Sequence, residues 1–159
     1  AYGSDKAAKE WFKRATDDDM KPDVFTYTSL IAACAKVSNV DSAEAWLSKM
    51  AQHKVNPLLM SYSAAINACA KNNLRKNGQR AYNLLSRMSA EGIYPNTVAY
   101  NAVLEALGKN RPVMTRESEL VFRHMIESGI ESDYFTQVYL RKVIGAERVR
   151  QLCAEVGVE

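Results

Sequence analysis

One ten-residue pattern recurs along the chain at nearly constant spacing, and it limits the possible folds more than any other feature. Each clear copy begins with a proline and places a tyrosine five residues later; the copies start at Pro22, Pro57 and Pro95. They are 35 and 38 residues apart, and a fainter copy without the proline starts at Ser132, 37 residues further on. Self-similarity with a period of about 20 to 50 residues is typical of stacked repeat units. The sequence therefore predicts an array of repeats in which each unit packs mainly on its neighbours.

Each unit contains two segments with the apolar spacing of an α-helix. In the second copy, Tyr62, Ala65, Ile66 and Cys69 are spaced i, i+3, i+4 and i+7, and the same spacing returns within residues 81–88. No segment alternates convincingly with the period of two that a strand requires. Short connections make successive helices antiparallel neighbours. The predicted fold is therefore an all-α solenoid of antiparallel helix-turn-helix repeats.

The repeat divides the chain into a truncated unit, three full units and a degenerate end. The predicted ranges are 5–22 for the second helix of a truncated unit, 23–57 for unit 1, 58–95 for unit 2, 96–132 for unit 3 and 133–159 for a degenerate final repeat. Within the last range, the segments Tyr134–Ile144 and Ala146–Val156 are separated by Gly145, and charged residues interrupt the apolar pattern. We expect this end to act as a polar C-terminal cap.

Composition and motifs argue against an enzyme, a metal site or a membrane protein. The net charge is only +3, and no apolar run approaches the ~18 residues of a membrane span. Cys34 and Cys69 occupy the same repeat position, where unit 3 has Leu107, which indicates packing rather than metal binding or redox chemistry. The acidic run at 17–19 is interpreted as a solvated helix end, and there is no glycine-rich phosphate loop, nucleophile motif or zinc spacing. We expect no catalytic residue, no cofactor, no metal and no small-molecule substrate.

Several of these features together resemble the pentatricopeptide repeat family over roughly residues 5–140. They are the period of about 35, an acidic or amide residue after the proline (Asp23, Asn96), the tyrosine, and a methionine that ends the second helix (Met50, Met88). The resemblance implies a right-handed superhelix that binds single-stranded RNA with one base per unit. It also implies an RNA-processing or expression factor of a mitochondrion or plastid. The natural protein is then expected to have more units than this chain.

The resemblance further implies which residues choose each base. In the family these are the residue after the repeat tyrosine and a residue at the boundary with the next unit. In this sequence the pairs are Thr28 with Leu58 in unit 1, Ser63 with Asn96 in unit 2 and Asn101 with Asp133 in unit 3. The third pair is similar to the family's uracil-preferring combination, and the second is similar to an adenine-preferring one. Leu58 departs from the pattern because leucine can neither donate nor accept a hydrogen bond, so the base of unit 1 stays unassigned.

Two further rows of residues recur with the tyrosine. The resemblance implies that the residues two positions before it stack on the bases: Phe25, Met60, Val98 and, in the fading copy, Phe135. Stacking of this kind is worth about 1–3 kcal/mol per base. Nine positions after the tyrosine stand Lys36, Lys71 and Lys109, which could contact the phosphate backbone.

The same residues have purely structural explanations. Asp23, Asn96 and Asp133 lie where helix N-caps belong, and lysines are favoured at helix C-termini by the helix dipole. The alternative function is therefore a helical-repeat scaffold that binds other proteins through a similar stack. A third possibility is the RNA-binding part of a protein-only ribonuclease, which would need a nuclease domain that this sequence does not contain.

Overall fold

The computed structural model describes Glu10, Phe12, Lys13 and residues 21–72 and 76–158, which fold as helices and connecting turns without a strand. The helices in these ranges are α2 (Val24–Lys36), α3 (Val40–Gln52), α4 (Leu59–Lys71), α5 (Asn77–Ala90), α6 (Thr97–Lys109), α7 (Thr115–Glu127), α8 (Tyr134–Ile144) and α9 (Ala146–Val156). The predicted all-α class is confirmed. Of the predicted range 5–22, the structure describes residues 10, 12, 13, 21 and 22, and the acidic run at 17–19 lies outside the described residues entirely.

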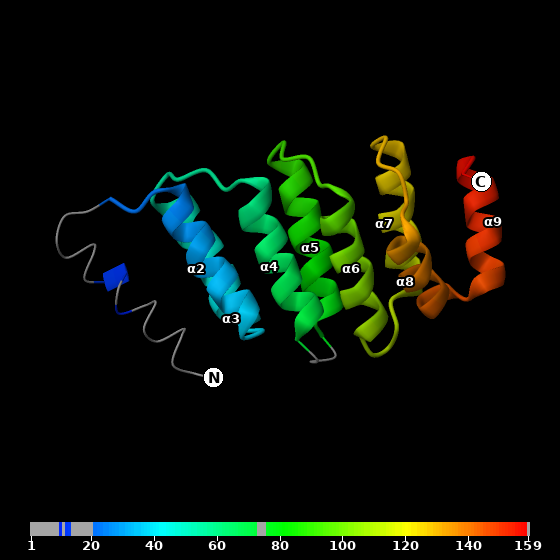
Figure 1. Cartoon of the computed structure of the whole chain (residues 1–159), viewed down its shortest axis with the longest axis horizontal. Coiled ribbons are helices and arrows are strands. Elements are labelled where there is room, and N and C mark those ends of the chain that lie inside the picture. The colour runs from blue at the N-terminus through cyan, green and yellow to red at the C-terminus, as the bar shows by residue number, and fades with distance from the viewer. Residues whose placement is uncertain (1–9, 11, 14–20, 73–75, 159) are drawn as a thin grey trace.

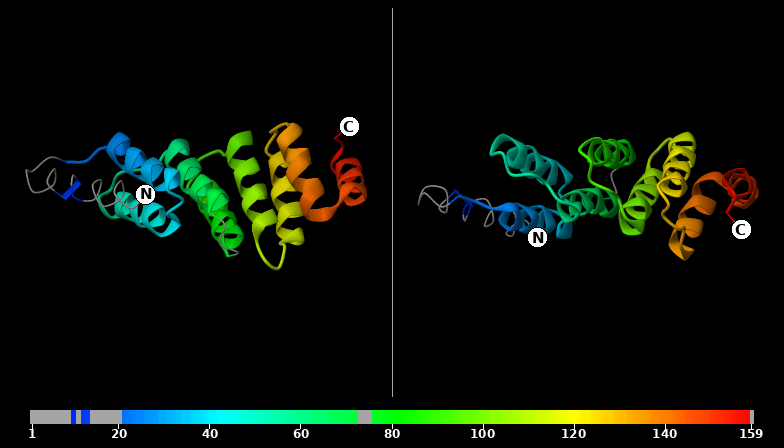
Figure 2. Two further views of the ribbon diagram at one scale, coloured as in Figure 1. Left: turned by 60° about the horizontal axis from the view of Figure 1, so that its bottom comes forward. Right: turned by 90° about the horizontal axis from the view of Figure 1, so that it is seen from above.

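The helices form hairpins that stand in a row, as Figure 1 shows. The first helices of the hairpins pack side by side, α2 on α4, α4 on α6 and α6 on α8. The second helices α3, α5 and α7 lie on the other side of the row in the right-hand view of Figure 2. Within the described ranges, the second helices make little direct contact with one another, and the small contact between α7 and α9 is the largest of these. The molecule is thus a two-layer solenoid with a continuous layer of first helices and a more open layer of second helices.

The core lies between the two layers and is organised by the repeat tyrosines. Tyr27, Tyr62 and Tyr100 are completely buried, as expected from their place in the apolar stripe. The hydroxyl of Tyr27 lies 2.6 Å from Nδ1 of His53, and that of Tyr100 lies 2.9 Å from Nδ1 of His124. Burial raises the pKa of Tyr100, so the phenol stays neutral at physiological pH. Tyr27 and Tyr100 therefore fill the hairpin core while their hydroxyls meet a histidine of the same hairpin. The buried hydroxyl of Tyr62 makes no such hydrogen bond among the described residues.

Three of the four residues just before the first helices cap those helices, as their sequence position predicts. Side-chain oxygens of Asp23, Asn96 and Asp133 accept hydrogen bonds from backbone N–H groups three residues later, at 2.8, 3.0 and 2.8 Å. Such a cap is worth about 1 kcal/mol because it satisfies a donor that the helix leaves unpaired. Leu58 occupies the same position before α4 and has no atom that could do this.

Unit 2 is three residues longer than unit 1, and its second helix α5 begins at Asn77. Gly78 is required there by the close approach of α5 to α6. A Cβ atom at this position would lie 2.9 Å from Cβ of Asn110 and 3.1 Å from the carbonyl oxygen of Ala106. Any larger side chain would push the two helices apart.

The row ends at α8 and α9, which were predicted with the same bounds. In α8, Gln137 stands at the tyrosine position and the exposed Arg141 stands where α6 has the buried Leu104. The last helix is held to α7 by charge: Nε and Nη2 of Arg148 donate to the two carboxylate oxygens of Glu119, at 2.7 and 2.6 Å. No helix in the described part of the chain is both long and apolar enough to pass through a lipid bilayer.

Candidate nucleic-acid interface

The six predicted base-reading residues lie at the seams between neighbouring first helices. Thr28, Ser63 and Asn101 are the fifth residues of α2, α4 and α6, whereas Leu58, Asn96 and Asp133 are the N-cap residues of α4, α6 and α8. Each predicted pair therefore combines one side chain from a first helix with the N-cap of the next first helix. The stacking of the hairpins brings together residues that are about 30 positions apart in the sequence.

The seam between α6 and α8 contains a complete hydrogen-bonded pair. Nδ2 of Asn101 donates to Oδ1 of Asp133 at 2.9 Å, and the hydroxyl of Thr136 donates to Oδ1 of Asn101 at 2.7 Å. Burial opposes ionisation of Asp133, but the hydrogen bonds from Thr136 and Asn101 outweigh it and lower the pKa of the carboxyl. Asn101 keeps one amide N–H, and Asp133 keeps its second carboxylate oxygen, without a partner among the described residues. The seam thus offers one donor beside one acceptor.

The predicted base-reading side chains do not project freely from an exposed helix face. Asn101 is only 9% exposed, because Asp133 and Thr136 of the next unit close over it. Thr28 and Ser63 are half-buried. A ligand would therefore meet the edges of these groups at the bottom of a seam rather than freely extended side chains.

The other two seams are incomplete. Between α4 and α6, Oδ1 of Asn96 is occupied by its cap, and the hydroxyl of Ser63 is shielded from solvent without a hydrogen-bond partner. Between α2 and α4, the hydroxyl of Thr28 lies 2.7 Å from that of Ser61, and Leu58 supplies no polar atom. Three equivalent places in the fold therefore present three different sets of donors and acceptors.

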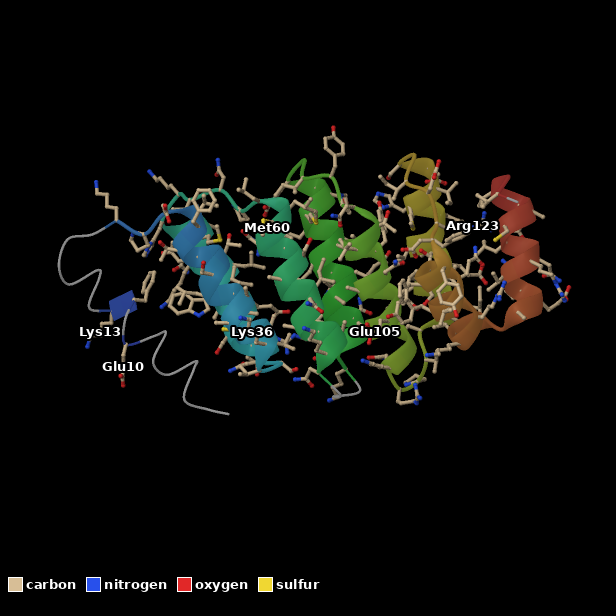
Figure 3. All side chains as sticks on the ribbon, in the orientation of Figure 1. Glu10, Lys13, Lys36, Met60, Glu105 and Arg123 are labelled. Carbon is tan, nitrogen blue, oxygen red and sulfur yellow. The ribbon has the colours of Figure 1, made fainter. Side chains whose placement is uncertain are left out.

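Large apolar side chains are exposed in a row beside the seams. The row consists of the predicted stacking residues, which are between 57% and 74% exposed: Phe25, Met60, Val98 and Phe135. Figure 3 labels Met60 near the N-terminal end of α4. Exposed apolar side chains that recur along one face indicate a binding surface rather than chance exposure. Their position next to the polar seams suits ligands that have a flat apolar face and a polar edge.

The three predicted phosphate-contacting lysines lie at the C-terminal ends of α2, α4 and α6, away from the apolar row. Lys36, labelled in Figure 3, and Lys71 are exposed, and neither forms an ion pair within the described residues. Lys109 differs because its Nζ donates to the backbone oxygen of Ala70 and to Oε1 of Glu105, both at 2.6 Å. Glu105 also accepts a hydrogen bond from the Tyr139 hydroxyl at 3.3 Å. Two of the three ammonium groups are therefore available to an anion, and the third links α4 to α6.

Two features that could support catalysis in the part of the chain that the structure describes are metal-ligand clusters and cysteine thiols. No group of three or more His, Cys, Asp or Glu side chains there could hold a metal ion. Cys34 and Cys69 are buried free thiols, and burial raises the pKa of Cys69 to about 12. A thiol with such a pKa is a weak nucleophile at neutral pH.

Sequence reasoning missed the hydroxyl residues that hold the base-reading side chains, Ser61 and Thr136. Both stand at the repeat position before the tyrosine, which also contains Thr26. The recurrence of a hydroxyl at this position was the available signal. Only the packing of neighbouring units shows what these hydroxyl groups contact.

Comparison with known families agrees with this architecture. A model described as "Pentatricopeptide repeat domain" matches residues 12–72 and 73–110, which together make up more than half of the chain. The chain belongs to the pentatricopeptide repeat family. Its sequence has no significant match among curated proteins.

Solved structures share the fold. The PPR domain of Arabidopsis thaliana protein-only RNase P 1 (PRORP1), solved in complex with tRNA, has a TM-score of 0.78 at 18% identity, covering 97% of this chain and 79% of that one. PPR10 in complex with an 18-nt psaJ RNA element has a TM-score of 0.75 at 24% identity, covering 95% of this chain and 21% of that one. PPR10 from maize has a TM-score of 0.74 at 27% identity, covering 96% and 22%. This chain thus spans about a fifth of the length of PPR10. The predicted solenoid of helical repeats is confirmed.

Proposed function

We propose that this chain is a sequence-selective module that binds single-stranded RNA, reads about one base per unit and does not cleave the RNA. The observation that carries the proposal is the row of exposed apolar side chains beside polar seams on the first-helix layer. A nucleobase has an apolar face and a polar edge, so one surface of this kind can stack on the face and hydrogen-bond to the edge. The RNA-bound structures of related proteins support the same reading.

The chemistry of the seams supports different bases in different units. In unit 3, the free N–H of Asn101 and the free oxygen of Asp133 match a carbonyl oxygen next to a ring N–H. Uracil has this arrangement, as does the larger base guanine, whereas cytosine and adenine have a ring acceptor in place of the ring N–H. In unit 2, the Nδ2 group of Asn96 is a donor suited to a ring nitrogen such as that of adenine. The Ser63 hydroxyl is shielded from solvent, so it contributes to base choice only if the seam opens around the base. Unit 1 has no polar boundary residue and stays unassigned.

The expected affinity of this chain is low. Three units at about 1–3 kcal/mol of stacking each give roughly 3–9 kcal/mol before the cost of ordering the RNA is subtracted. A dissociation constant in the micromolar range or weaker follows. A longer natural protein with more units would bind more tightly, and we propose that it acts in a mitochondrion or plastid by masking or positioning an RNA. Fluorescence microscopy of the tagged full-length protein in cells would test this location.

The experiment that tests the proposal exchanges the unit 3 pair for the unit 2 pair, with Asn101→Ser together with Asp133→Asn. Binding of labelled RNAs that differ at one base is measured by fluorescence anisotropy. We expect the preference to move from uracil toward adenine at that base only. Leu120→Ala, on the opposite layer, is the control and should leave the preference unchanged. A double variant with the wild-type preference would contradict base reading by this pair.

A protein-binding scaffold is the second candidate, and one observation favours it. On the second-helix layer, a cavity of about 310 Å³ lies between α5 and α7 and is lined in part by Tyr82, Leu85 and the exposed Leu120. A scaffold would use this side of the molecule. In that case, alanine at Leu120 would weaken partner binding, and the exchange at Asn101 and Asp133 would have no effect on it.

A further inference from the structure

The residue before the repeat tyrosine forms a recurring contact between units. It faces the predicted base-reading residue of the preceding unit. Ser61 lies 2.7 Å from Thr28 between their hydroxyl oxygens, and the Thr136 hydroxyl lies 2.7 Å from Oδ1 of Asn101. At the remaining junction this position is Ala99, which has no polar side-chain atom, and the Ser63 hydroxyl has no hydrogen-bond partner.

We propose that the residue before the repeat tyrosine is a positioning residue, which determines the hydrogen-bonding atoms that the preceding unit presents to a base. This inference rests on the proposed function, because it concerns the same seams. It adds a third residue, contributed by the next unit, to each predicted base-reading pair. For unit 3 that residue is Thr136.

The hydrogen bonds around Asn101 show how the positioning works. The Thr136 oxygen accepts a hydrogen bond from the backbone N–H of Asp133 at 3.1 Å, so its own hydrogen is free to point to an acceptor. Oδ1 of Asp133 already accepts from the backbone N–H of Thr136 and from Asn101. Donation from the Thr136 hydroxyl to Oδ1 of Asn101 therefore closes a ring of hydrogen bonds among the three residues, and one N–H of Asn101 and the second oxygen of Asp133 stay outside it. Because a carboxylate can only accept, the amide nitrogen of Asn101 must face Asp133.

The consequence is that unit 3 presents a fixed pattern. The carboxamide is held at both ends, so one N–H is left for a ligand and the amide cannot turn its oxygen toward Asp133. In unit 1, by contrast, either hydroxyl of the Thr28 and Ser61 pair can be the donor, so Thr28 can offer either a donor or an acceptor. We therefore expect strict base choice in unit 3 and relaxed choice in unit 1.

The test removes the hydroxyl while keeping the shape of the side chain, with Thr136→Val, and restores a hydroxyl with Thr136→Ser. We expect the ratio of affinities for RNAs with uracil or cytosine at the unit 3 base to fall by about fivefold in the valine variant, the size of one ordinary hydrogen bond. The serine variant should keep the wild-type ratio. A general loss of folding would weaken the binding of both RNAs equally and leave the ratio of their affinities unchanged.

The chain offers a matched control for the helix cap. The Thr26 hydroxyl donates to Asp23 within its own unit at 2.8 Å, as the Thr136 hydroxyl can to Asp133. Thr26→Val disturbs a cap of the same kind but should not change base choice in unit 3. An unchanged ratio in Thr136→Val, or an equal change in Thr26→Val, would overturn the inference while leaving the proposed function intact.

A measurement without RNA separates the two proposals. Solvent exchange of the Asn101 side-chain amide, followed by NMR, should be slow in the wild type and in Thr136→Ser and faster in Thr136→Val. Equal exchange in all three proteins would show that Thr136 does not hold Asn101, which overturns the inference whether or not RNA binds. Absence of binding to every RNA by the wild type would instead overturn the proposed function, and the role of Thr136 in base choice with it.

Discussion

The two layers of the solenoid consist of helices of similar length and apolar spacing, yet they are held together differently. First helices pack directly on one another from α2 to α8. Second helices are bridged mainly by charge. Arg80 of α5 bonds to Asp41 and Glu44 of α3 at 2.8 and 2.7 Å, and Arg148 of α9 bonds to Glu119 of α7. Continuous packing thus gives the first layer the fixed seams that a recognition surface requires.

Within the first layer, one face of the helices contributes to stability and the other carries the candidate recognition surface. The buried face carries the repeat tyrosines and aliphatic residues, and the other face carries the apolar row, the seams and the lysines. The second layer has no equivalent row among the described residues; Leu120 is its one large apolar side chain that is substantially exposed there. Variants on the two layers should therefore have different consequences.

The largest expected difference between the layers is in stability. Leu104→Ala removes a completely buried side chain of α6 and should lower the free energy of unfolding by about 2–5 kcal/mol. Leu120→Ala shortens a side chain of α7 that is 44% exposed and should cost far less, about 0.5 kcal/mol or below. Urea unfolding followed by circular dichroism measures both. Similar losses would show that the second layer contributes more packing than its structure indicates.

A smaller effect is expected from repairing the incomplete seam in unit 1. Leu58→Asn supplies the missing N-cap of α4 and should raise the free energy of unfolding by about 1 kcal/mol. Leu58 is 49% exposed, so little apolar packing is lost in the exchange. Leu58→Ala is the control that removes the leucine without adding a cap. The prediction fails if the asparagine variant is no more stable than the alanine variant in thermal unfolding.

The lysines at the end of the first layer should differ in how they affect RNA binding. Lys71→Gln removes an exposed ammonium group and should reduce the salt dependence of binding, the slope of log K against log salt, by about 0.7 for one lost phosphate contact. Lys109→Gln should leave this slope nearly unchanged, because the ammonium group of Lys109 is already hydrogen-bonded to the Ala70 carbonyl oxygen and the Glu105 carboxylate. Titrations at several salt concentrations measure both slopes. Equal reductions would mean that Lys109 leaves its internal partners when RNA binds.

The smallest effect concerns the ion pairs of the second layer at low pH. The hydrogen bond from Arg148 lowers the pKa of Glu119 below its ordinary 4.5. A carboxyl with a lowered folded-state pKa stabilises the fold above the unfolded-state value, and this contribution is lost as the pH falls through the folded-state value. Stability should therefore decline below about pH 4.5. Arg148→Gln should make this decline shallower, as measured by urea unfolding from pH 6 to pH 3; an unchanged decline would exclude a contribution from this pair.

Much of the fold could be predicted because its signals are local. The spacing of apolar residues in α8 and α9 gave both helices their observed bounds, since an α-helix is defined by contacts between residues three and four positions apart. The burial of Tyr27, Tyr62 and Tyr100 and the caps at Asp23, Asn96 and Asp133 follow from the same short-range patterns. The exposed row was also predictable, because it keeps a constant distance from the tyrosine.

The hydrogen-bond partners within each seam could not be predicted, because they are residues that meet only when hairpins stack. Asn101 is enclosed by Thr136, 35 positions away, and Lys109 is occupied by a carbonyl oxygen 39 positions away. Ser63 lacks a partner because Ala99 replaces a hydroxyl in the next unit. The amino-acid sequence alone determined the helices, their pairing and the face that carries each row. The tertiary structure decided which polar groups remain available, because the register between neighbouring hairpins, and no contact within a helix, sets the distances across a seam.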